Sequence, residues 1–149
     1  MDFTALSPVL ESTALGVLIA RGPDARSFLQ GQLSNDLAAL TPRNGLLASC
    51  NSPQGRVQAV LTLLDRGDEI WLLLPEPMVQ TVRMRLQKYV LRAKVTLEDG
   101  SAHWKICGLM DPNCLPLLEL IGLSLDPLGH MMLDAISVIR WPDPMQRYA

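Results

Sequence analysis

Residues 45–75 read GLLASCNSPQGRVQAVLTLLDRGDEIWLLLP and contain three apolar runs separated by two short polar segments. The segments NSPQG (51–55) and DRGDE (65–69) hold the Pro, Gly and Asp residues that reverse a chain. We therefore expect three consecutive strands joined by two hairpin turns. The first turn also carries two side-chain amides and is followed by Arg56, none of which a hairpin requires. This turn is either an ordinary reversal or part of a binding site.

The flanking segments predict further strands, and helices that pack on this sheet. Residues 14–20 form a short apolar run typical of a strand, and helical spacing begins near Pro23. Residues 78–91 form the clearest amphipathic helix, and its apolar stripe consists of Val79, Val82, Leu86, Tyr89 and Val90. Further strands are expected at 94–98, 102–110 and 131–141, with a short helix at 115–123. From residue 45 the order is β-β-β-α-β-β-α-β, which predicts an α+β fold, a ferredoxin-like plait of mixed or antiparallel sheet with helices on one face.

The composition predicts a soluble protein with an excess of apolar residues. Of 149 residues, 48% are hydrophobic and 19% are charged, and the mean hydropathy is +0.18. A small domain has a large surface for its volume and ordinarily needs more polar residues. Either some apolar surface meets a partner, a second copy or a missing part of the same protein, or the sheet is tightly buried with short loops. The net charge of −2 gives no electrostatic support for non-specific nucleic-acid binding.

The cysteines and the apolar runs indicate an intracellular protein without a membrane partner. Cys50, Cys107 and Cys114 have neither the spacing of a disulfide framework nor that of a paired metal site, which favours reduced thiols. No signal-peptide core opens the chain, and no apolar run approaches the length of a membrane span.

Recognisable catalytic and metal-binding motifs are missing from the sequence. His103 and His130 are isolated, so we expect ordinary residues and no metal site. Cys50 is either a reactive thiol at a strand end or, as is more common, a buried residue. The acidic residues of DRGDE are expected to be solvated turn residues. Trp71 is either part of the core or a wall beside a planar ligand.

Three motifs, in this order, resemble the YgfZ family of folate-binding proteins, which are relatives of the aminomethyltransferase of the glycine-cleavage system. The motifs are FLQGQLSND (28–36), GLLASCNSPQGRVQAVLTLL (45–64) and KYVLRAKVTLED (88–99). The resemblance implies a tetrahydrofolate-binding accessory protein that assists the assembly or repair of iron–sulfur proteins. It also implies a location in the bacterial cytoplasm or, in a eukaryote, the mitochondrial matrix.

The resemblance further implies a folate site around the first turn. The amides of Asn51 and Gln54 would match the edge of a pterin, and Arg56 would pair with a carboxylate. Alternatively, Arg56 ties down the hairpin and Asn51 caps its own turn. The turn and the Trp71 strand would form one wall of the pterin cleft. Arg92 and Lys94 would either attract the glutamate tail or be solvated or structural residues. The cofactor-binding residues expected on this basis are Leu47, Asn51, Gln54, Arg56, Trp71, Leu73 and Arg92.

The resemblance argues against catalysis and indicates a partial chain. In the aminomethyltransferases an aspartate pair follows the turn, and counting onward from Gly55 places those positions at Gln58 and Ala59. We therefore expect no catalytic residue and no aminomethyl transfer.

Family members form a ring of three domains. Residues 1–44 would supply part of the first, and residues 45–149 would supply a ferredoxin-like second domain with a returning strand. The third domain and its KGC[YF]TGQE motif are absent, so we expect a truncated form that lacks its C-terminal half or forms a homodimer. The alternatives are a folate-dependent one-carbon transferase and a dimerising interaction module without a ligand.

Overall fold

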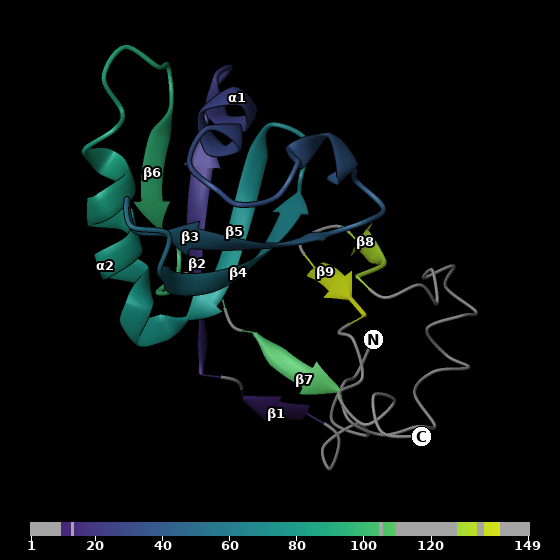
Figure 1. Ribbon diagram of the computed structural model, residues 1–149. Helices are drawn as coiled ribbons and strands as arrows, with labels where there is room; N and C mark the ends of the chain where they lie inside the picture. Colours follow the sequence, from purple (N-terminus) through teal and green to yellow (C-terminus); the bar gives the residue numbers. More distant parts are fainter. Residues whose placement is uncertain (1–9, 13, 105, 110–127, 134–135, 141–149) are drawn as a thin grey trace, which may run out of the picture.

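The computed structural model describes residues 10–12, 14–104, 106–109, 128–133 and 136–140 (Figure 1). Their elements, in chain order, are β1 (Leu10–Ser12), β2 (Leu15–Arg21), α1 (Ala25–Gln30), the 3₁₀ turn η2 (Leu37–Ala39), β3 (Leu46–Asn51), β4 (Val57–Asp65), β5 (Glu69–Pro75), α2 (Glu76–Gln87), β6 (Thr96–Asp99), β7 (Cys107–Leu109), β8 (His130–Leu133) and β9 (Ile136–Ile139).

A five-stranded antiparallel sheet forms the centre of the structure, in the order β3-β4-β5-β2-β6. Without the edge strand β3, the order β4-β5-β2-β6 and the two intervening helices are those of a ferredoxin-like unit. The predicted α+β fold is thus confirmed. Two small sheets accompany it, one pairing β1 with β7 and one pairing β8 with β9.

The ferredoxin-like unit begins earlier than the predicted boundary between residues 44 and 45. Strand β2 lies before that boundary, yet it pairs with β5 on one side and β6 on the other. The boundary would therefore cut through the sheet, and residues 15–99 belong to one unit. The sequence does not show this, because β2 and β5 are separated by about fifty residues of chain and neither strand identifies its partner.

Both helices cover the same face of the sheet. Ala25, Phe28 and Leu29 of α1 are buried, as are residues on one side of α2, and they share a continuous apolar core with the strands. The α2 residues in this core are Val79, Val82 and Leu86. Fully burying one such side chain contributes about 1.5–3 kcal/mol to the free energy of unfolding.

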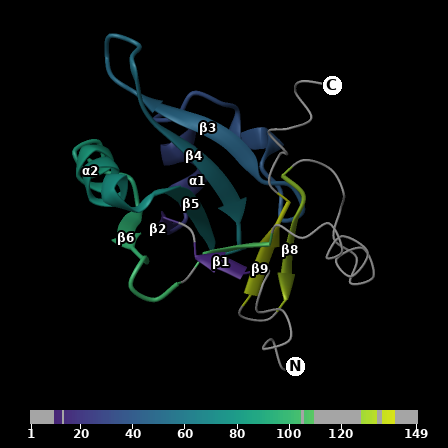
Figure 2. The ribbon, with the colours of Figure 1, turned by 90° about the horizontal axis from the view of Figure 1, so that it is seen from below.

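The opposite face of the sheet is only half covered. The central strands β2 and β5 are buried on both sides, whereas β3 and the first half of β4 alternate between buried and exposed residues. A second apolar cluster of Val17, Ile19, Leu64, Trp71 and Leu73 covers the central part, and Trp104, Ile106 and Ile139 pack against it. Figure 2 shows α2 on one side of the sheet and the β8–β9 hairpin on the other. The uncovered part lies along β3 and β4.

Several elements differ from the sequence-based expectation. The helix predicted at 78–91 begins at Glu76 and ends at Gln87, and Tyr89, predicted on its buried stripe, is 45% exposed. The strand predicted at 102–110 is confined to Cys107–Leu109, and a hairpin of β8 and β9 replaces the single strand predicted at 131–141. The helix predicted at 115–123 lies outside the described residues. Among the described residues, no helix has the length and apolar character needed to cross a bilayer.

Candidate functional site

The turn between β3 and β4 closes on its own backbone. The Ser52 N–H donates to the Arg56 carbonyl at 2.8 Å, and the Gly55 N–H donates to the Ser52 carbonyl at 2.9 Å. The Arg56 N–H also donates to Ser52 Oγ at 3.2 Å. Gly55 has φ +80°, a conformation that glycine adopts without steric cost. These bonds fix the turn, while the side chains of Gln54 and Arg56 remain exposed.

Asn51 joins this turn to the rest of the molecule. Its carbonyl accepts a hydrogen bond from Arg85 Nη2 at 2.5 Å, and its Oδ1 accepts one from Ser49 Oγ at 2.8 Å. The register between β3 and β4 shifts between Cys50 and Asn51, as in a β-bulge. Asn51 therefore does not cap its own turn. The Arg56 side chain makes no hydrogen bond or ion pair with another described residue, so it does not tie down the hairpin.

An exposed apolar surface adjoins the turn. Directly opposed residues of antiparallel strands share a face, so Ser49 lies beside Val60 and Leu47 beside Thr62 on the face away from the helices. Leu47 is 45% exposed and Val60 is 52% exposed. The site thus places two amides and a guanidinium next to an apolar surface, a combination suited to a flat ligand with a polar edge and a carboxylate.

Trp71 and Leu73 lie on the same face but are covered. Both are 4% exposed, and the Trp104 ring meets the Trp71 ring edge-on, with centroids 4.6 Å apart. Trp71 pairs with Leu64 near the end of β4, whereas the turn lies at its beginning, about 23 Å away at 3.3 Å per residue. The single wall expected from the turn and Trp71 is therefore not formed among the described residues, because β4 separates them by its length.

The remaining predicted residues are spread more widely. Leu73 opposes Thr62, which in turn opposes Leu47, so these three form one row across the sheet. Arg92 is exposed in the loop between α2 and β6, at the opposite edge of the sheet from β3 (Figure 1). The structure brings together Leu47, Asn51, Gln54 and Arg56, and leaves Arg92 apart from them.

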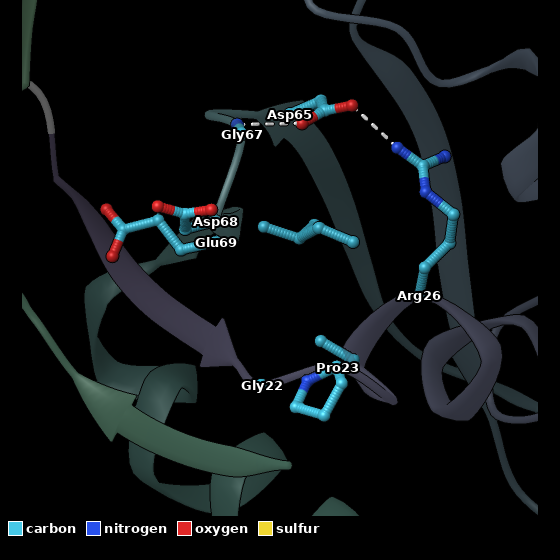
Figure 3. A pocket seen from close by; sticks show the side chains of 9 residues that line it. Gly22, Pro23, Arg26, Asp65, Gly67, Asp68 and Glu69 are labelled. Carbon is cyan, nitrogen blue, oxygen red and sulfur yellow. Dashed lines mark hydrogen bonds and ion pairs between the residues drawn. The ribbon is translucent and has the colours of Figure 1, made fainter. Parts of the chain in front are cut away.

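A hollow of about 630 Å³ lies elsewhere, between the start of α1 and the β4–β5 turn. Figure 3 shows Arg26 reaching over it to Asp65. Arg26 Nη2 donates to Asp65 Oδ2 at 2.6 Å, and the Gly67 N–H donates to Asp65 Oδ1 at 2.9 Å. Arg26 also donates to the carbonyls of Leu37 and Leu40. These groups satisfy one another, so the hollow is a structural junction.

Two of the three acidic residues of the β4–β5 turn, Asp65 and Glu69, are not simply solvated as predicted, whereas Asp68 is exposed in agreement with the prediction. Asp65 is 8% exposed and paired with Arg26. Glu69 accepts hydrogen bonds from Arg21 Nε at 2.7 Å and from Trp71 Nε1 at 2.6 Å. The Glu69 hydrogen bond is the main reason that the pKa of Arg21 is raised, and Glu98 adds to it. No sequence signal marks the ion pairs of Arg26 with Asp65 and of Arg21 with Glu69, because their members are distant along the chain.

Arg66 and His130 form a second feature that the sequence did not reveal. Arg66 Cζ lies 4.0 Å from the Trp71 ring centroid and 5.1 Å from that of Trp104. His130 is 2% exposed, and neither its ring nitrogens nor Arg66 Nη1 has a hydrogen-bond partner among the described residues. Burial lowers the pKa of His130 and nearby Arg66 lowers it further, while the Pro42 carbonyl and Asp65 oppose the shift.

The other candidates from the sequence take structural positions. Cys50 is buried and free, in agreement with its reading as a buried residue. No group of three potential metal ligands occurs among the described residues. Gln58 is exposed, whereas Ala59 is 7% exposed and lies in the core beneath the helices.

No family model matches the sequence, but individual proteins are similar to it. The tRNA-modifying protein YgfZ of Photorhabdus laumondii is 24% identical over 136 residues, which are 89% of this chain and 41% of that protein. The tRNA-modifying protein YgfZ of Edwardsiella ictaluri is 29% identical over 126 residues, 83% of this chain and 38% of that protein. A mitochondrial iron–sulfur cluster assembly factor IBA57 homolog of Mycosarcoma maydis is 31% identical, covering 75% of this chain and 31% of that protein.

A solved structure shows the same fold. The glycine cleavage system aminomethyltransferase T of Bartonella henselae matches with a TM-score of 0.65 and 17% identity, covering 78% of this chain and 33% of that one. The chain spans about two fifths or less of each of these proteins. The similarity covers a part of each longer protein.

Proposed function

We propose, from the premise that this chain is a relative of the N-terminal part of YgfZ-type proteins, that it binds tetrahydrofolate and assists the assembly or repair of iron–sulfur proteins. The aminomethyltransferase fold supports the first half of the proposal, and the name of the Mycosarcoma maydis relative supports the second. The observation that carries the proposal is the exposed face of β3 and β4 beside the turn at 51–56.

The residues of this face fit the chemistry of a folate. Arg56 is exposed and unpaired among the described residues, so its guanidinium is available for a bidentate pair with a carboxylate. The amides of Asn51 and Gln54 can both donate to and accept from a pterin edge. Leu47 and Val60 supply apolar surface for the ring. Leu73 continues the row of Leu47 and Thr62 on this face. Trp71, which packs against Trp104, and Arg92 and Lys94, which lie at the opposite edge of the sheet, fall outside the proposed contact set.

The proposed role is binding without turnover. Gln58 and Ala59 carry no carboxylate, and Ala59 lies beneath the helices, where no ligand on the exposed face would meet it. A one-carbon transfer therefore has no acid or base at these positions. The proposed partners are folate, iron–sulfur client proteins, and a second copy or further segment that covers the open sheet face. The proposed location is the bacterial cytoplasm or the mitochondrial matrix.

Calorimetric titration of the purified chain with tetrahydrofolate, under reducing and anaerobic conditions, tests the proposal. Arg56→Ala removes a charged hydrogen-bond donor, which contributes about 1.5–3 kcal/mol, so we expect roughly 10- to 100-fold weaker binding. Arg43→Ala, an exposed arginine at the other end of β3, is the matched control and should bind like the wild type. Absence of binding by the wild type, or equal binding by both variants, would contradict the proposal.

A further inference from the structure

We infer that Arg85 is a positioning residue that holds the turn at 51–56 in its binding conformation. The inference rests on the proposed function for the identity of the ligand. It concerns a residue that lies on α2 and outside the expected binding set. Two arginines on this helix, Arg83 and Arg85, make comparable bonds to different strands.

Arg83 and Arg85 lie two residues apart and leave opposite flanks of α2. Arg83 Nε donates to the Leu97 carbonyl at 2.9 Å, and Arg85 Nη2 donates to the Asn51 carbonyl at 2.5 Å. Leu97 belongs to β6 and Asn51 to β3, the two opposite edges of the sheet. Both arginine side chains are half-buried, and both bonds pair a charged donor with a neutral acceptor. Each bond therefore ties the helix to one edge strand with similar strength.

Only the Arg85 bond ends at the proposed binding turn. Among the described residues, the hydrogen bonds of residues 52–56 are made with one another, as the bonds around Ser52 and Arg56 show. The turn is thus a rigid unit carried on the ends of β3 and β4. The register shift between Cys50 and Asn51 lies at its base. Bulges bend and twist the strand that bears them, so the angle of the turn at this point needs a separate restraint.

Arg85 supplies this restraint. Its guanidinium holds the Asn51 carbonyl from the helix side, next to the register shift, while Ser49 holds the Asn51 side chain from β3. Together these contacts fix the direction in which Gln54 and Arg56 are presented. Without the helix contact, the turn would sample a range of angles and its internal hydrogen bonds would open more often. A ligand would then bear the entropic cost of ordering it.

The test compares Arg85→Met with Arg83→Met. Both variants remove one charged bond between α2 and an edge strand, so both should lower the free energy of unfolding by a similar amount. Amide exchange measured by NMR at Ser52, Gly55 and Arg56 should accelerate in Arg85→Met and not in Arg83→Met. Tetrahydrofolate affinity should fall on the order of tenfold in Arg85→Met alone. Arg85→Lys, which keeps a donor, should recover part of both effects.

The inference would be overturned if amide exchange in the turn accelerated equally in the two methionine variants, or if it did not accelerate in Arg85→Met. The exchange measurement needs no ligand, so it judges Arg85 even if the proposed function is wrong. Failure of the wild type to bind tetrahydrofolate would reject the proposed function. Unchanged affinity in an Arg85→Met variant with a loosened turn would reject the positioning role.

Discussion

At the scale of single residues, His130 is a buried titratable group without a hydrogen bond to a described residue. The groups near its ring are the Arg66 guanidinium, the Asp65 carboxylate and the Pro42 carbonyl. Burial lowers the pKa of His130, and the positive charge of Arg66 acts in the same direction. The imidazole is therefore neutral at pH 7, buried at the start of β8.

The lowered pKa of His130 predicts a loss of stability in mild acid. In the unfolded chain the imidazole gains its proton near the ordinary pKa of 6.5, whereas in the folded protein it does so only at lower pH. The unfolded state thus binds more protons below about pH 6.5, and the free energy of unfolding falls as the pH is lowered toward the folded pKa. Thermal unfolding between pH 7.5 and 5 should show this decline, and His130→Leu should reduce its slope.

His103→Leu replaces the other histidine, which is exposed, and serves as the matched control. If His130→Leu kept the full wild-type slope, the decline would have to come from other groups. The sequence could not have indicated this behaviour, because an isolated histidine gives no sign of whether its ring is buried.

At the scale of elements, the connection between β2 and α1 depends on Gly22. Its φ is +117°, and a Cβ at this position would lie 2.2 Å from the Lys94 carbonyl oxygen. The same crossing is held by the Lys94 N–H, which donates to Asp24 Oδ2 at 2.7 Å. The close approach of these two segments leaves room only for glycine.

Gly22→Ala should therefore be much more destabilising than Gly67→Ala. Gly67 also has a positive φ, +83°, but its added Cβ would meet nothing within 4 Å. Gly67→Ala should lower the free energy of unfolding by about 1–2 kcal/mol from backbone strain alone. Gly22→Ala adds a collision with backbone, and we expect a total loss of about 3 kcal/mol or more. Urea unfolding measures both, and equal losses would show that the crossing is not tight.

The elements also show what periodicity can predict. The apolar runs of residues 45–75 predict β3, β4 and β5 at nearly their observed positions, because turn residues lie between consecutive strands. The apolar stripe predicted for residues 78–91 identifies Val79, Val82 and Leu86 correctly as buried residues. The predicted helix continues past its observed end at Gln87, since the following residues KYVLR contain no helix breaker. The helix ends because the chain must turn back to place β6 beside β2, which is a tertiary requirement that overrides local propensity.

At the scale of the whole molecule, the partial covering of the sheet was the least predictable feature. The apolar excess indicated either an interaction surface or a tightly buried sheet, and the described structure combines a tightly buried centre with an exposed apolar surface along β3 and β4. The central strands are buried on two sides, while Leu47 and Val60 remain open beside the turn. The composition predicts that some apolar surface is exposed, but only the strand order determines where on the sheet that surface lies. The turn was recognisable from its surplus polar residues, whereas the contact with Arg85 depends on helix packing.

The open face predicts a measurable surface property. Leu47 and Val60 share one face on neighbouring strands and are about half exposed, so a dye that binds apolar surface should bind there. Leu47→Glu combined with Val60→Glu should roughly halve dye fluorescence and shift any self-association measured by light scattering toward the monomer. Substitutions at exposed positions usually change the free energy of unfolding by about 0.5 kcal/mol or less, so the fold should persist. Met84→Glu, at a 57% exposed position on α2, controls for added charge. If Met84→Glu reduced dye binding as much as the double variant, the dye would not be binding specifically to the face of β3 and β4. The apolar surface that meets a partner would then lie over the helices.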